Sequence, residues 1–112
     1  MVGHLNPVEE EAITKLKALL GHKLANSLNS VLLYGSKARG DYSNDSDIDI
    51  LVVADAVTPD IKDIIRDTVL DVQLEYSLPI SVHIRSFDYF TTQQNNRLNL
   101  FIHNVEREGI RV

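Results

Sequence analysis

Apolar residues recur along the first part of the chain at the spacing of a helix. From Pro7 onward, aliphatic side chains fall three or four positions apart, which predicts a helix over residues 7–25. Asn6 is a common helix-capping residue, and Glu9 three positions later is typical of a capping box. Proline suits the first helical turn, so the helix is expected to begin at Pro7.

The same spacing predicts two further helices. One begins after the Thr58-Pro59 pair and ends before Pro79, because proline is tolerated in a first turn and interrupts a later one. The other carries apolar side chains from Leu98 onward on one face and ends at Gly109, a common C-terminal cap.

Three short stretches are instead typical of buried or half-buried strands. They are SVLLYG (residues 30–35), DIDILVVA (47–54) and ISVHIR (80–85), with a short edge strand expected at residues 110–112. Ser86 is expected to cap a short turn after the third strand. This order of elements predicts an α/β (α+β) chain, with a small mixed sheet of three or four strands and helices on one face.

Composition narrows the classes of protein and of partner. The 112 residues form one expected domain and carry 16 acidic and 11 basic side chains, a net charge of −5, so duplex nucleic acid is not an expected partner. The absence of cysteine excludes disulfides and thiolate metal ligands. No apolar run is long enough to cross a membrane, and the first residues do not resemble a signal peptide, so the cytoplasm is the expected location.

Two aspartates at the start of the second strand need a compensating partner. Strand alternation puts Asp47 and Asp49 on one side, about 6.6 Å apart, where their charges repel. A divalent cation would remove this repulsion, and Mg²⁺ suits carboxylate oxygens completed by water and substrate phosphates. The alternative is structural, with Asp47 capping the strand or pairing with Lys37 or Arg39.

The turn after the first strand has the features of a phosphate-binding loop. Gly35 allows a close approach of the backbone to a ligand, and Ser36 offers a hydroxyl and an amide. Lys37 and Arg39 add positive charge, and the Arg39 guanidinium matches two phosphate oxygens. Each feature alone is as typical of an ordinary turn or an exposed surface. Together they predict an anion pocket beside the aspartates.

These residues resemble a known signature. Gly35 and Ser36, ten intervening residues, then Asp47 and Asp49 resemble the motif of the DNA polymerase β nucleotidyltransferase superfamily. The stretch LLYGSKARGDYSNDSDIDILVV is similar to its minimal nucleotidyltransferase branch, small proteins often encoded beside a HEPN-domain partner. The resemblance implies a palm-like nucleotidyltransferase domain over residues 1–112. It also implies that Gly35 and Ser36 hold the β- and γ-phosphates of a nucleoside triphosphate, that Arg39 contacts the triphosphate, and that Asp47 and Asp49 are catalytic Mg²⁺ ligands.

The reaction implied by this resemblance is transfer of a nucleotide. An acceptor hydroxyl on a protein or small molecule attacks the α-phosphate, AMP from ATP being the expected group, and pyrophosphate leaves. The alternative is a catalytically weak, nucleotide-binding antitoxin or regulatory subunit that acts by contact with a HEPN-type partner. A domain this small has little surface for an acceptor, so we also expect a partner protein or a homo-oligomer.

One feature departs from the resemblance. Active members of the superfamily carry a third carboxylate on the next strand, whereas residues 80–85 offer Ser81, His83 and Arg85 on the polar face. We expect Ser81 at the position of the missing acid, with His83 next along the same face, where its imidazole is a candidate base. The carboxylates that flank this strand in the sequence, and that could lean toward the site, are Asp71, Glu75 and Asp88.

Overall fold

A four-stranded mixed sheet forms the centre of the molecule, with the strand order β3-β2-β1-β4. The computed structural model describes most of the chain, namely residues 4–40, 47–96 and 98–112. β1 (Leu28–Tyr34) pairs antiparallel with both β2 (Ile48–Ala54) and β4 (Ile110–Arg111), whereas β3 (Ile80–Ser86) pairs parallel with β2. The predicted mixed sheet of three or four strands is therefore confirmed, with four strands.

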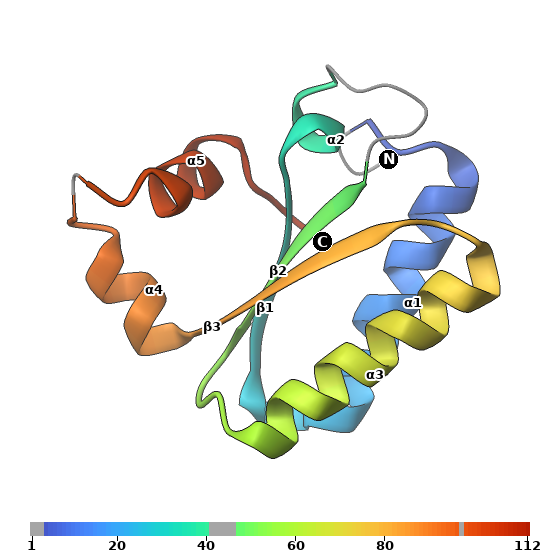
Figure 1. Ribbon diagram of the computed structural model, residues 1–112, viewed down its shortest axis with the longest axis horizontal. Helices are drawn as coiled ribbons and strands as arrows, with labels where there is room; N and C mark the ends of the chain where they lie inside the picture. The colour runs from blue at the N-terminus through green and yellow to red at the C-terminus, as the bar shows by residue number, and fades with distance from the viewer. Residues whose placement is uncertain (1–3, 41–46, 97) are drawn as a thin grey trace.

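Two long helices cover one face of this sheet, α1 (Pro7–Leu24) and α3 (Pro59–Tyr76) (Figure 1). The predicted capping box at the start of α1 is present, since the Asn6 side chain accepts from the Glu9 amide at 2.8 Å and Glu9 accepts from the Asn6 amide at 2.9 Å. Across the described ranges, no helix combines the length and apolar character needed to cross a membrane. The main core lies between the two helices and the strands.

The opposite face carries a second layer that the sequence analysis did not anticipate. α4 (Phe87–Gln93) and α5 (Leu100–Glu108) lie there, on the side of the sheet away from α1 and α3 (Figure 1). Leu51 and Val53 of β2 pack against Val105 of α5 on this face. The two long helices thus lie on one face, as predicted, and the two short helices cover the opposite face.

Two expectations for this C-terminal region change in the structure. The turn expected after the third strand is a helix of seven residues, α4, and the Ser86 hydroxyl caps it by accepting from the Tyr89 amide at 3.1 Å. Leu98 was expected on an apolar helical face but precedes α5 and is 89% exposed. Asn99 caps α5 instead, through a 3.1 Å hydrogen bond from the Ile102 amide, so the helix starts later than predicted.

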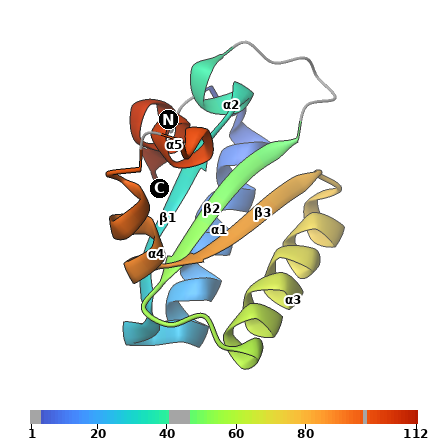
Figure 2. The same ribbon diagram turned by 60° about the vertical axis from the view of Figure 1, so that its left-hand side comes forward.

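A single helical turn, α2 (Ser36–Arg39), follows β1 after Gly35 and lies at the end of the sheet where β2 begins (Figure 2). A buried ion pair connects it to α1, with Lys37 Nζ 2.7 Å from Glu9 Oε2. The backbone oxygen of Lys37 also accepts from the His4 amide at 3.0 Å. The short helix α2 is therefore held against the N-terminal helix.

Candidate active site

The Gly35 turn and the Asp49 carboxylate touch. Gly35 follows the last residue of β1 and has φ +74°, a backbone conformation that favours glycine. A β-carbon built on Gly35 would collide with Asp49 Oδ2. The backbone of the predicted phosphate-binding turn thus lies directly against one of the two predicted metal ligands, with no room for a side chain between them.

The register of the sheet explains how Asp49 reaches this position. Asp49 is paired with Tyr34, the last residue of β1, so the residue after Tyr34 is beside the Asp49 side chain. Asp49 is half-buried and shares its face of the sheet with Leu51, on the side covered by α4 and α5. Asp47 is exposed and precedes β2 by one residue, so it lies at the entrance of the strand.

The basic residues of the turn do not all behave as the sequence analysis expected. Lys37 was predicted to add charge to a phosphate pocket, but its side chain is only 3% exposed and its ammonium is paired with Glu9. A charge in the protein interior needs an opposite charge, and Glu9 provides it from the first turn of α1. The backbones of Ser36 and Arg39 lie in α2, and their side chains fall outside what the structure describes.

An aromatic cluster lies on the same face of the sheet as Asp49. The Tyr34 ring lies 5.9 Å from the His83 ring and 5.5 Å from the Phe101 ring, and His83 and Phe101 are 5.2 Å apart, measured between centroids. The Arg85 guanidinium lies 5.5 Å from the Phe101 ring centroid and 5.6 Å from that of Tyr89. These spacings are typical of favourable aromatic and cation–π contacts, so α5 is fixed to the sheet beside the site.

Tyr34 reports the electrostatics of this pocket. Burial, followed by the negative charge of Asp49, raises the pKa of the Tyr34 phenol to about 12, and the positive charge of Arg85 opposes the rise. The hydroxyl therefore stays protonated at neutral pH and is available as a hydrogen-bond donor. It cannot serve as a general base there.

Ser81 lies opposite Asp49, at the position where a third carboxylate would be expected. β2 and β3 pair in parallel with Asp49 matched to Ser81 and Leu51 matched to His83, so both polar residues share the Asp49 face. Asp88 is in the first turn of α4, beyond the far end of β3 and about 20 Å from Ser81 along the chain direction. Among the described residues, the position opposite Asp49 is thus polar and uncharged.

The two acidic candidates on α3 lie on the other side of the sheet. α3 packs against the face formed by Ile48 and Ile50, whereas Asp49 points to the face shared with Leu51. Asp71 is exposed on that helix, and Glu75 is paired with Lys15 of α1 at 2.6 Å. The sheet itself separates these carboxylates from the candidate site.

The carboxylates of Asp47 and Asp49 suit a magnesium ion whose remaining ligands come from water and substrate. In the described part of the chain, no three or more His, Asp or Glu side chains gather as metal ligands would. Asp47 and Asp49 supply two carboxylates, one exposed and one half-buried beside Gly35. Mg²⁺ commonly takes one or two protein carboxylates together with waters and phosphate oxygens, so this pair is chemically suitable.

Sequence reasoning missed the contacts that support this site. Tyr34 stands directly before Gly35, and alternation places its side chain on the Asp49 face once the pairing of β1 and β2 is known. Phe101 was expected only as a core residue of a helix, and no local pattern indicates that it reaches His83. The Glu9–Lys37 pair joins residues 28 positions apart, and only the folded chain brings them together.

Comparison with known proteins decides the family. The model of the nucleotidyltransferase domain matches residues 10–109. The chain belongs to the nucleotidyltransferase domain family. Two proteins of Methanocaldococcus jannaschii, each named "putative protein adenylyltransferase", are 36% and 31% identical to it over 102 residues. These alignments cover 90% and 91% of this chain and 94% and 96% of the relatives.

Solved structures agree at the level of the fold. A crystal structure of a mutant toxin–antitoxin complex, MntA-HpeT, matches this nucleotidyltransferase domain with a TM-score of 0.57 at 18% identity. That match covers 96% of this chain and 72% of the other. A toxin–antitoxin structure with AMP-PNP matches with a TM-score of 0.56 at 19% identity, over 91% of this chain and 70% of the other. The nucleotidyltransferase fold expected from the sequence is thus confirmed.

Proposed function

We propose that this nucleotidyltransferase transfers AMP from ATP, with Mg²⁺, to a hydroxyl group of a protein. The observation that carries the proposal is the contact between the Gly35 backbone and the Asp49 carboxylate. That contact brings a turn able to receive phosphates next to a ligand suited to a divalent cation. Two similar proteins carry the name "putative protein adenylyltransferase", which supports AMP as the transferred group and a protein as the acceptor.

In this proposal each site residue has a role. Gly35 and Ser36 hold the β- and γ-phosphates, Arg39 contacts the triphosphate, and Asp47 and Asp49 hold Mg²⁺. Bound Mg²⁺ would neutralise charge on the phosphate oxygens and favour departure of pyrophosphate. These assignments follow the signature, and the closeness of Gly35 to Asp49 supports them.

The bond changes balance without a further reactant. The acceptor oxygen forms a bond to the α-phosphorus, and the bond from that phosphorus to the oxygen bridging to the β-phosphate breaks. Pyrophosphate leaves with the electron pair, and the acceptor hydroxyl loses its proton. Ser81 and His83 lie on the same face of the sheet as Asp49, and His83 is the candidate to receive the proton.

The position of Ser81 supports a second candidate function. Opposite Asp49, the described part of the site has a hydroxyl where active relatives of the superfamily have a carboxylate. A chain with such a site would bind nucleotide and turn it over slowly, and would act as an antitoxin-like subunit by contact with a partner protein, with a HEPN-type protein as the candidate. The toxin–antitoxin complexes among the structural neighbours are consistent with this reading.

One experiment separates the two functions. The protein is incubated with ATP labelled at the α-phosphate, Mg²⁺ and the product of the adjacent gene, and label on protein is measured. Transfer is expected with the natural chain, none with Asp49→Asn, and faster transfer with Ser81→Asp if the missing carboxylate limits the rate. The Ser81→Asp change is matched by Ser81→Asn, which adds similar bulk without a charge.

The remaining outcomes distinguish the alternatives. A rise in melting temperature with ATP and Mg²⁺, but no label on any protein, would favour the binding subunit, since ligand at 100 times its dissociation constant adds about 2.7 kcal/mol of stability. The absence of both protein labelling and a thermal shift would contradict both functions. Co-purification with the adjacent gene product that survives Asp49→Asn would indicate that contact alone is sufficient for the partnership.

A further inference from the structure

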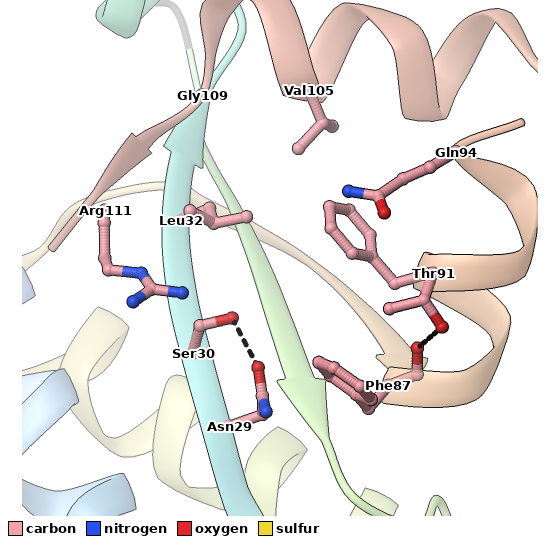
Figure 3. Close-up of a pocket in the computed structure, with 10 residues that line it drawn as sticks. Asn29, Ser30, Leu32, Phe87, Thr91, Gln94, Val105, Gly109 and Arg111 are labelled. Atoms are coloured by element: carbon pink, nitrogen blue, oxygen red, sulfur yellow. Dashed lines mark hydrogen bonds between the residues drawn. The ribbon is translucent and has the colours of Figure 1, made fainter.

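A cavity of about 570 Å³ lies on the same face of the sheet as Asp49, between β1 and the α4–α5 layer (Figure 3). Its apolar wall consists of Leu32 from β1, Val105 from α5, and Phe87 and Phe90 from α4. Phe87 is 42% exposed, so a large aromatic surface stays open to a ligand. This volume is in the usual range for ligand pockets, about 300–1,000 Å³.

The polar side chains of this groove include a cation that has no acceptor among the described residues. Arg111 of β4 is paired with Leu32 in the sheet, so its side chain lies on the groove side (Figure 3). Within the ranges that the structure describes, neither the Arg111 guanidinium nor the side-chain amide of Gln94 bonds to another residue, and no carboxylate lines the groove. On a chain with a net charge of −5, this local cation favours an anionic group beside an apolar one.

The layer that carries the groove also has exposed apolar side chains, of which Phe87 lines the groove. Phe87, Tyr89, Leu98 and Leu100 are four of the large exposed apolar side chains in the described ranges, and all belong to α4, α5 or the segment between them. The sheet register relates the groove to the candidate active site. Ser30 in the groove precedes Tyr34, the partner of Asp49, by four residues, or about 13 Å along β1.

We propose that this groove binds a segment of the acceptor protein in which an acidic side chain stands beside an aromatic one. The carboxylate pairs with Arg111 and accepts from the Gln94 amide, and the aromatic ring packs on Phe87 and Leu32. A segment anchored there has only a few residues to span before reaching Asp49. This inference rests on the proposed function, because it gives the acceptor its docking site.

A peptide pair tests the groove without any nucleotide. The probe is a fluorescent octapeptide, capped at both ends, in which two glutamates flank a phenylalanine, and its control has glutamine at both glutamate positions. The acidic peptide is expected to bind about tenfold more tightly in fluorescence polarisation, a ratio that one charge-assisted hydrogen bond supplies. In NMR spectra it should move the amide signals of Ser30, Thr91 and Gln94.

Two matched variants locate the charge contact. Arg111→Gln is expected to remove the preference for the acidic peptide, because it removes the cation of the groove. Arg107→Gln, the same change on the exposed side of α5 outside the groove, should leave the preference intact. Equal binding of the two peptides, amide shifts that map elsewhere, or an unchanged preference in Arg111→Gln would overturn the proposal. Phenylacetate binding in the groove as tightly as the peptide would also overturn it, in favour of a small-molecule site.

The outcome can be separated from that of the proposed function. Asp49→Asn should abolish AMP transfer and leave peptide binding unchanged, because Asp49 does not line the groove. Peptide binding without any transfer in the natural chain would leave the groove standing and contradict catalysis. Transfer to the acceptor that is unaffected by Arg111→Gln would contradict the groove as a docking site and leave the proposed function standing.

Discussion

Gly35 occupies a backbone conformation and a contact that only glycine fits. Its φ is +74°, and a β-carbon there would overlap the Asp49 carboxylate. We expect Gly35→Ala to lower the free energy of unfolding by about 1–3 kcal/mol and to displace Asp49, which weakens the binding of ATP with Mg²⁺. Thermal unfolding with and without the nucleotide measures both effects.

Gly21 is the matched control for this substitution. It lies within α1, and a β-carbon there would meet no atom within 4 Å. Alanine is the better helix former, so Gly21→Ala should leave stability unchanged or raise it by up to about 1 kcal/mol. Equal stability and equal nucleotide response of the two variants would contradict the role given to Gly35.

Tyr34 makes a testable link between the site and alkaline pH. Its pKa is raised from 10 in the unfolded chain to about 12 in the fold, chiefly by burial. Between pH 10 and about 12, the folded state therefore keeps a phenol proton that the unfolded state has released. The stability that Tyr34 contributes is complete below pH 10 and is lost as the pH rises toward 12. Tyr34→Phe should flatten the loss of stability across this interval.

The measurement is a set of unfolding curves at increasing pH for the natural chain and for Tyr34→Phe. A phenolate absorbance titration of both proteins supplies the control, since the late-titrating component should be missing from the variant. Identical pH dependence in the two proteins would contradict the assigned shift.

At the scale of elements, the buried Glu9–Lys37 pair joins α2 to α1. The two side chains are only 6% and 3% exposed and their charged atoms lie 2.7 Å apart. Glu9 also completes the capping box of α1, so one carboxylate serves both the helix start and the turn. The orientation of the turn after β1 therefore depends on the first helix.

Glu9→Gln should separate these two roles, because glutamine keeps the capping oxygen and loses the charge. Removing one member of a buried pair costs about 3–5 kcal/mol, so we expect a loss of that order in urea unfolding. The double variant Glu9→Gln with Lys37→Met should be more stable than Glu9→Gln alone, since no buried charge is left. A double variant that loses the sum of both single effects would contradict the pairing.

At the scale of the whole molecule, the sheet separates a large core from a small one. α1 and α3 bury most of the apolar residues on one face, while α4 and α5 cover the face of Asp49 with a few contacts centred on Leu51, Val53 and Val105. A layer with so few buried contacts is expected to open more readily than the main core.

Phe101→Ala tests this division. The ring links α5 to Tyr34 and His83 of the sheet, and its removal should cost about 1–3 kcal/mol, less than a fully buried phenylalanine because the ring is half-buried. Hydrogen exchange should accelerate in α4 and α5 and stay nearly unchanged in α1 and α3. Faster exchange throughout the molecule would contradict two layers of unequal stability.

Local pattern by itself determined the long helices, the three main strands and the glycine-serine and aspartate motif. The cap at Asn6, the proline at position 59 and the alternation of residues 80–85 act within a few positions of the chain, and such signals are legible without a fold. The opposition of Ser81 to Asp49 was also predicted correctly, because strand alternation leaves few choices of face.

Tertiary structure alone decided which charges are paired and which face each helix covers. Lys37 directly follows the glycine-serine turn and was expected to add charge to a phosphate pocket, and only the approach of α1 makes it the buried partner of Glu9. The second helical layer, the cluster of Tyr34, His83 and Phe101, and the groove beside Arg111 join segments far apart in the chain. Contacts of this kind depend on how distant elements pack against one another, and the local pattern of residues does not determine that packing.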